Sequence, residues 1–200
     1  MANGGLLFFS AQFVQTLGNF TVTQSTLLKV AAAAIAMLMS IISGLIAWRA
    51  QQNIYTGILM CSISLAGTLI LIFIPDGAIK LLGYYLSWGL AEALPMLAAI
   101  FGSNVSGYSK KIFYNGSMIA AYTISQFVGP LVMLDREKPR YTTGMIIFAA
   151  GNALAIVCFV VMRIMIVREN KQRIANPPSQ IYNVNLGLTD REDRNFLYKF

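Results

Sequence analysis

The sequence predicts an all-α integral membrane protein, and two observations carry that prediction. Of the 200 residues, 56% are apolar and only 12% are charged, with a mean hydropathy of +0.63. A soluble domain carries about twice that share of charge, so this chain has too little polar surface to be one. The apolar residues also fall into long runs without strict alternation, which favours helices over a membrane barrel. A helix crosses a hydrocarbon core of about 30 Å with roughly 20 such residues.

The first three expected spans are set by where the apolar runs begin and stop. Residues 4–17 form only a partial span, which contains Gln12 and Gln15 and has no basic residue before it, as a signal peptide would. The second span, residues 29–48, begins at the first charge, Lys29, and ends at the polar stretch 49–53. The third, residues 54–74, stops before the Pro-Asp-Gly turn signal at 75–77.

The next three spans follow the same logic. Residues 79–101 carry Pro95, which removes a backbone hydrogen bond and predicts a kink. The polar stretch 106–111 separates this span from residues 112–134, where Gly129 and Pro130 predict a kink or a break. The charged stretch 135–140 precedes the last span, residues 141–167, whose small side chains suit close helix approach.

The chain therefore divides into a six-helix transmembrane bundle over residues 1–167 and a tail over residues 168–200. The tail is polar and contains Pro177 and Pro178, so we expect a weakly ordered extension. Because the sequence opens inside a helix without a leader, we expect a fragment whose first helix is truncated.

Several function classes are excluded by composition. Histidine is absent, which removes the commonest general base and metal ligand. Cys61 and Cys158 lie in apolar runs and form no metal-ligand cluster, so neither a metal nor a cofactor is expected. The chain has no paired carboxylates and no phosphate-binding glycine loop, so it is not expected to be an enzyme. The net charge of +7 is better explained by basic loops beside a membrane than by nucleic-acid binding.

The sharpest candidate for a functional group is Glu92, the only acid inside any expected span. A carboxyl group in the membrane is costly and is a functional hypothesis by default. Tyr85, Trp88, Glu92 and Met96 share one face of an α-helix. A protonated Glu92 that only satisfies a neighbouring helix is an equally good interpretation.

Residues 112–134 hold a second set of polar side chains on one helical face: Asn115, Tyr122 and Gln126. They could hydrogen-bond a substrate. They could also hold helices together within the bilayer, which is the more common role for such residues.

Residues 103–111, Ser-Asn-Val-Ser-Gly-Tyr-Ser-Lys-Lys, are followed by Gly129-Pro130 and by Lys138-Pro139-Arg140-Tyr141. In this order they resemble the allantoate permease group of fungal transporters, in the anion:cation symporter branch of the major facilitator superfamily. Residues 167–170, Val-Arg-Glu-Asn, and 188–193 also resemble the C-terminus of that family. The chain departs from it at Leu131, where the family often has Gln, and at residues 31–34, where relatives often carry Pro-Gly.

The resemblance implies that the six spans correspond to helices seven to twelve of a twelve-helix carrier with a cytosolic C-terminus. The charge distribution alone does not fix that orientation. Such a carrier holds its substrate near the bilayer midplane between two six-helix halves. The partners would then be the lipid bilayer, a small organic anion, possible coupling protons, and either the missing N-terminal half or a second copy of this chain.

Two functions thus stand side by side. The favoured one is a multi-pass secondary transporter in the plasma membrane, carrying allantoate or a vitamin carboxylate by proton-coupled symport. Its substrate path would include Tyr85, Trp88, Glu92, Asn115, Tyr122 and Gln126. The alternative is a structural or regulatory membrane protein that does not transport, or the inert product of a truncated transporter gene.

Overall fold

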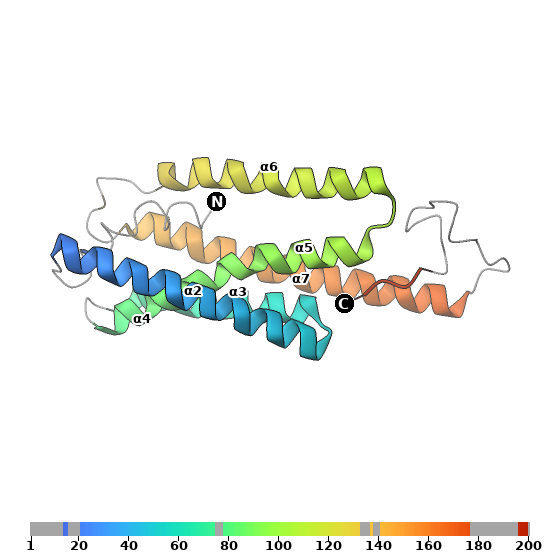
Figure 1. The fold of residues 1–200 in the computed structure, drawn as a ribbon, viewed down its shortest axis with the longest axis horizontal. Coiled ribbons are helices and arrows are strands. Elements are labelled where there is room, and N and C mark those ends of the chain that lie inside the picture. The colour runs from blue at the N-terminus through green and yellow to red at the C-terminus, as the bar shows by residue number, and fades with distance from the viewer. Residues whose placement is uncertain are drawn as a thin grey trace.

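The computed structural model describes residues 14–15, 21–74, 78–132, 137, 141–176 and 196–199, and within them it contains helices and no strand. The helices run roughly along the long axis of the molecule (Figure 1). In chain order they are α2 (Val22–Ala50), α3 (Asn53–Phe73), α4 (Ala78–Ser87), the 3-10 helix η1 (Trp88–Glu92), α5 (Ala93–Asn104), α6 (Tyr108–Val132) and α7 (Thr142–Ala175).

Helix α2 turns its small side chains inward and its large apolar ones outward. Its buried residues are two serines and two alanines, whereas Leu38 and Trp48 are 57% and 70% exposed. A water-soluble bundle would bury the large side chains. In lipid they can face the acyl chains, while small residues allow helices to approach each other. Helix α3 instead buries both kinds of side chain: small or polar ones such as Gly67 and Thr68, and large apolar ones such as Ile54.

Four of the described helical stretches are long and apolar enough to cross a membrane: Val22–Ala50, Asn53–Phe73, Ile79–Asn104 and Thr142–Ala175. Together with the helical content, they confirm the predicted all-α membrane fold. The span expected over residues 112–134 is also one helix, α6, but α6 does not meet the same apolarity criterion. Its first turn carries Lys110 and Lys111, and its polar face includes Asn115 and Gln126.

Helix α3 is the centre of the packing. Its main partners are α7, α4 and α5, while α2 crosses η1 and α6 lies beside α5 (Figure 1). One buried apolar cluster includes Leu71, Tyr84 and Phe148, so it joins α3, α4 and α7. A second cluster includes Ile54, Cys61, Ile100 and Phe159, and it joins α3, α5 and α7. The bundle therefore has a continuous interior organised around α3.

Helices α3 and α4 approach each other closely at Gly67 and Gly83. A Cβ atom at Gly67 would lie 2.7 Å from the backbone oxygen of Gly83. A Cβ atom at Gly83 would lie 2.9 Å from the backbone oxygen of Gly67. Of the small residues in the last span, Gly144 is buried, Ala155 packs against the second cluster, and Ala150 and Gly151 line a cavity.

The helices differ from the expected spans mainly at their ends. Helix α7 continues past Val167 to Ala175, so the first part of the expected tail is helical. Residues 168–175 are charged and polar but include good helix formers such as Glu, Lys, Gln and Arg, which carry the helix beyond its apolar part. Helix α6 also passes through Pro130 to Val132 without a break at that residue. The partial span 4–17 lies outside the described residues, except for Val14 and Gln15.

A glycine turn connects α5 to α6. Gly107 has a φ of 96°, a backbone conformation that side chains disfavour. Its carbonyl accepts the backbone N–H of Lys111 at 3.0 Å, which helps to start α6. The turn places the start of α6 at the same end of the bundle as the ends of α2, α5 and α7 (Figure 1). We call this the C-terminal end of the bundle.

The start of α2 is fixed by a capping box. The Thr21 side chain accepts the backbone N–H of Gln24, and the Gln24 side chain accepts the backbone N–H of Thr21 at 3.1 Å. Removing an N-cap hydroxyl costs about 1 kcal/mol. We therefore expect Thr21→Ala to lower the free energy of unfolding in detergent micelles by about that amount. The control is Thr26→Ala, because that hydroxyl only bonds the carbonyl of Val22 within the helix. An equal loss in both variants would contradict the cap.

Candidate functional site

The expected fourth span is broken in the middle into α4, η1 and α5. Two residues explain the break. Pro95 has no N–H to donate to the carbonyl of Ala91, so regular α-helical bonding cannot pass through this turn. Gly89 lies against α3, and a Cβ atom there would be 2.9 Å from the backbone oxygen of Met60. The kink expected at Pro95 thus takes the form of a 3-10 turn just before it, ending at Glu92.

Glu92 is buried at the end of this 3-10 turn, with only 5% of the residue exposed. Its Oε2 accepts a hydrogen bond from Ser43 Oγ of α2 at 3.1 Å. Ser43 is fully buried, and its hydroxyl also lies 2.9 Å from the carbonyl of Ser40. A carboxyl group at this depth is stable only when protonated or paired. Among the described residues, Ser43 is the only hydrogen-bond partner found for it.

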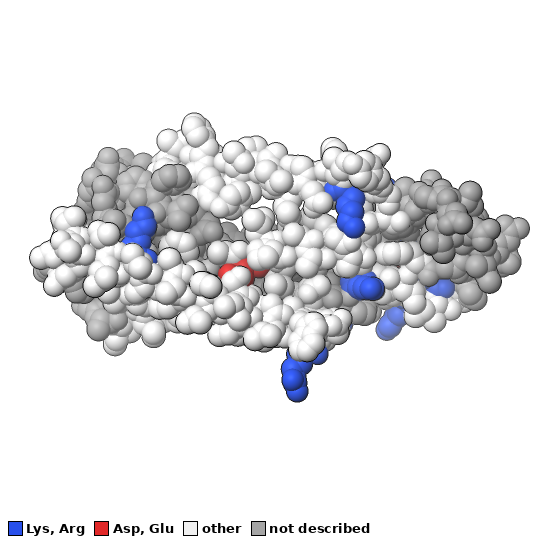
Figure 2. All heavy atoms as spheres, in the orientation of Figure 1, with Lys and Arg blue, Asp and Glu red and all other residues white. Residues whose placement is uncertain are grey.

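The charges of the described residues are distributed unevenly along the bundle. On the face shown in Figure 2, one acidic patch lies near mid-length, with basic side chains on both sides of it along the long axis. Of the three acids among the described residues, Glu92 is the one within a membrane-spanning stretch. Glu137 precedes α7, and Glu169 lies in the polar last turns of α7.

A chain of polar groups supports the broken span from the side of α3. Ser87 Oγ donates to the carbonyl of Tyr84 at 2.6 Å, and Ser64 Oγ of α3 donates to the carbonyl of Ser87 at 2.8 Å. Thr68 Oγ1 donates to the carbonyl of Ser64 at 2.7 Å, and Asn152 Nδ2 of α7 lies 3.4 Å from Thr68 Oγ1. These bonds satisfy carbonyls beside the change from α to 3-10 geometry and fix η1 in the bundle.

Tyr85 and Trp88 are near Glu92 in the sequence, but their side chains do not share its partner Ser43. Both pack on the first apolar cluster, and their rings lie 5.6 Å and 6.3 Å from that of Tyr84. The indole Nε1 of Trp88 is buried and has no hydrogen-bond acceptor among the described residues. It is therefore a free donor within the same 3-10 turn that ends at Glu92.

The α6 candidates form a separate group. Tyr122 is 40% exposed, and Gln126 Nε2 donates to its hydroxyl. The Gln126 Oε1 atom is buried and has no donor among the described residues. Asn115 is half-buried nearer the start of α6. Gln126 and Tyr122 thus present one free acceptor and one hydroxyl on the same face of α6.

A cavity of about 640 Å³ is lined by residues of η1, α5, α6 and α7. Tyr122 and Ser125 contribute its hydroxyl groups and Cys158 a thiol, while the rest of the lining is apolar. Leu90 and Ala91 of η1 form part of its wall. Glu92 does not line it and instead faces Ser43 of α2. Within this structure the two groups of candidates therefore do not meet in one cavity.

Sequence analysis missed the side chains that hold the site together. Ser43, Ser64 and Asn152 are all fully buried within apolar helices. The available signal was the presence of small polar residues inside long apolar runs, because such residues need a partner in lipid. Among the described residues, no group of three His, Cys, Asp or Glu side chains could hold a metal ion.

The sequence is similar to those of several fungal transporters. No family model matches the chain, and no solved structure matches it. An uncharacterised transporter of Schizosaccharomyces pombe is 25% identical over all of the chain and 40% of its own length. An MFS-type transporter of Penicillium expansum is 27% identical over 98% of the chain and 42% of its own length. The allantoate permease of Saccharomyces cerevisiae is 30% identical over 60% of the chain and 23% of its own length.

The chain spans about two fifths of the length of the first of these relatives. The similarity to the two longer matches covers nearly every residue of the chain, including the helices that carry Glu92 and Tyr122. The homologues of this multi-pass membrane protein are thus fungal transporters of the MFS type.

Proposed function

We propose that the chain is one half of a secondary transporter that carries a small organic anion by proton-coupled symport. The observation that carries the proposal is the buried Glu92 carboxyl group, held by Ser43 at the break of a membrane-spanning helix. A carboxyl group that can gain and lose a proton within the bilayer is a suitable coupling group. The sequence similarity to the allantoate permease supports allantoate, or a vitamin carboxylate of similar size, as the substrate.

In this proposal some candidate residues bind the substrate and Glu92 exchanges the proton. Trp88 Nε1 and Gln126 offer a free donor and a free acceptor for polar groups of the substrate. Tyr85, Asn115 and Tyr122 would line the rest of the path, and Glu92 would exchange the proton. The path is completed across the bilayer by a second six-helix half, either a missing N-terminal half or a second copy of this chain.

The basic residues of the described helices favour the cytosolic C-terminus that we propose, although Arg136, Lys138 and Arg140 before α7 make the count over the full sequence nearly even. At the C-terminal end of the bundle lie Arg49 at the end of α2, Lys110 and Lys111 at the start of α6, and Arg168 and Lys171 in the last turns of α7. Among the described residues, the opposite end carries Lys29 and Lys80. Cytoplasmic ends of membrane helices carry the excess of Lys and Arg.

The test is uptake of labelled allantoate by fungal cells that lack their own carrier. The chain is expressed alone and together with the N-terminal half of a related fungal transporter. We expect uptake that rises at acidic external pH and stops when a protonophore collapses the proton gradient. Uptake by the chain alone would favour a second copy as the other half. A chain that inserts in the membrane and supports no uptake in either setting would favour the non-transporting alternative.

A further inference from the structure

The last described residues of the chain, Phe196–Lys199, lie in extended form across the C-terminal end of the bundle (Figure 1). We call them the terminal segment. They contact Asn104, the last residue of α5, and Asn170 and Arg173 in the final turns of α7. We call these three residues the clasp.

Each asparagine of the clasp binds the main chain of one residue by two hydrogen bonds. Asn104 Nδ2 donates to the Lys199 carbonyl at 2.8 Å, and the Lys199 N–H donates to Asn104 Oδ1 at 2.6 Å. Asn170 Nδ2 donates to the Tyr198 carbonyl at 2.8 Å, and the Tyr198 N–H donates to Asn170 Oδ1 at 3.0 Å. A primary amide that uses its donor and its acceptor in this way reproduces the pairing of a neighbouring β-strand.

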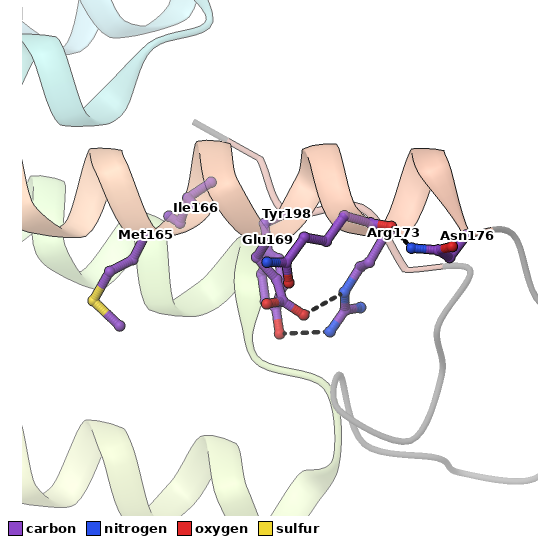
Figure 3. A pocket seen from close by; sticks show the side chains of 7 residues that line it. Met165, Ile166, Glu169, Arg173, Asn176 and Tyr198 are labelled. Atoms are coloured by element: carbon purple, nitrogen blue, oxygen red, sulfur yellow. Dashed lines mark hydrogen bonds and ion pairs between the residues drawn. The ribbon is translucent and has the colours of Figure 1, made fainter.

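Arg173 contacts the side chain of Tyr198, whose main chain is bonded by Asn170. Its Nη2 donates to the Tyr198 hydroxyl at 3.1 Å, and its guanidinium lies 4.7 Å from the centre of the Tyr198 ring. A further bond runs from Nη1 to the Phe196 carbonyl at 2.7 Å. Glu169, one turn earlier, accepts from Arg173 Nε at 3.0 Å and orients it, as Figure 3 shows. Glu169, Arg173 and Tyr198 line a cavity of about 620 Å³.

With the terminal segment in place, the side chains that bind it are shielded from solvent. Asn104 and Asn170 are only 7% and 9% exposed, and the Arg173 side chain is 8% exposed. Buried amides and guanidinium groups need hydrogen-bond partners, and the cost of leaving them without one is larger than the gain from a typical bond. The terminal segment supplies those partners.

The clasp also connects two helices that otherwise share few contacts. Helix α5 packs mainly on α3, η1 and α6, while α7 packs mainly on α3. The terminal segment bonds the end of α5 through Asn104 and the end of α7 through Asn170. Tethering on one chain raises the effective concentration of such a segment to roughly the millimolar range, so individually weak bonds suffice to keep it in place.

We propose that Asn104, Asn170 and Arg173 form a binding site for an extended peptide main chain, that its occupant is the terminal segment of the same chain, and that the segment fastens α5 to α7. This site is separate from the cavity beside Tyr122 and does not depend on transport.

Hydrogen exchange of the full chain in lipid nanodiscs tests the proposal amide by amide. The reference is a synthetic peptide of residues 195–200 in the same buffer. In the unaltered chain, the amides of Tyr198 and Lys199 should exchange about tenfold more slowly than in the peptide. Asn170→Ala should remove the protection of Tyr198, and Asn104→Ala that of Lys199. Asn176→Ala is the matched control, because its amide only bonds the carbonyl of Gln172 in its own helix.

Three outcomes would overturn the assignment. The first is exchange at the peptide rate in the unaltered chain. The second is protection that survives Asn104→Ala together with Asn170→Ala. The third is loss of protection in the unaltered chain when each nanodisc holds one copy instead of several, which would assign the occupant to a second copy.

Discussion

Replacing Glu92 by glutamine should reduce the initial rate of substrate uptake by about tenfold or more and remove its dependence on the proton gradient. Glutamine keeps the size of the side chain and can still accept the hydroxyl of Ser43, which now lies 3.1 Å from Glu92 Oε2. It cannot bind and release a proton in the physiological range. The packing of η1 against α2 should therefore survive while the coupling is lost.

The matched control for this variant is Glu137→Gln. Glu137 is also a carboxylate, but it lies before α7 and accepts the backbone N–H of Thr143 at 2.8 Å. Its replacement should leave the pH dependence of uptake unchanged. A second variant, Ser43→Ala, removes the hydrogen-bond partner of Glu92 and should lower the rate of uptake. Ser62→Ala serves as its control, because that hydroxyl only bonds the carbonyl of Ile58 in its own helix. Unaltered, gradient-dependent uptake in Glu92→Gln at equal surface level would rule out the coupling role.

The second large effect is expected at Gly67, where α3 and α4 meet. An added Cβ atom would lie 2.7 Å from the Gly83 oxygen, the Ser87 nitrogen and the Leu86 Cβ. Two of these are backbone atoms, so no rotamer change relieves the overlap and the helices must separate. We expect Gly67→Ala to lower the free energy of unfolding by about 3 kcal/mol, at the upper end for overpacked interiors.

The same substitution at Gly102 should have the opposite sign. A Cβ atom there meets nothing within 4 Å, and alanine is favoured over glycine inside a helix by about 1 kcal/mol. Unfolding of both variants in mixed micelles, followed by circular dichroism, compares them directly. Destabilisation of Gly102→Ala by as much as Gly67→Ala would show that steric overlap between α3 and α4 is not the cause.

The sequence was informative wherever a property repeats along one helix. The apolar runs predicted the helices from α2 to α7 because burial in lipid requires length and apolarity, which are local quantities. Hydropathy ended the last span at Val167, whereas helix α7 continues to Ala175. Arg168 and Lys171 are not apolar, but both are good helix formers. The polar segment expected after Val167 is thus partly helix and partly the docked terminal segment.

The contacts that define the candidate site and the clasp lay beyond such reasoning. Ser43 and Glu92 are 49 positions apart, and Asn104 and Lys199 are 95 apart. No helical period links such positions, so only the packing of the bundle brings them together. The α-helical stripe of Tyr85, Trp88 and Glu92 was also drawn for a continuous helix. The turn from Trp88 to Glu92 is 3-10, with fewer residues per turn, so the spacing along it changes.

The hydrogen bonds of the clasp restrict amino-acid substitutions in the helices more than in the terminal segment. Five of its six hydrogen bonds to the terminal segment end on main-chain atoms of that segment, and the sixth ends on the Tyr198 hydroxyl. All residues except proline carry the same main-chain donor and acceptor, so Leu197 can be replaced, and Lys199 by any residue but proline, without loss of a bond. Asn104 and Asn170 have no such latitude, because aspartate lacks the donor and alanine lacks both groups. We therefore expect substitutions to be restricted at Asn104 and Asn170, near the ends of α5 and α7, and to be tolerated at Leu197 and Lys199 of the terminal segment.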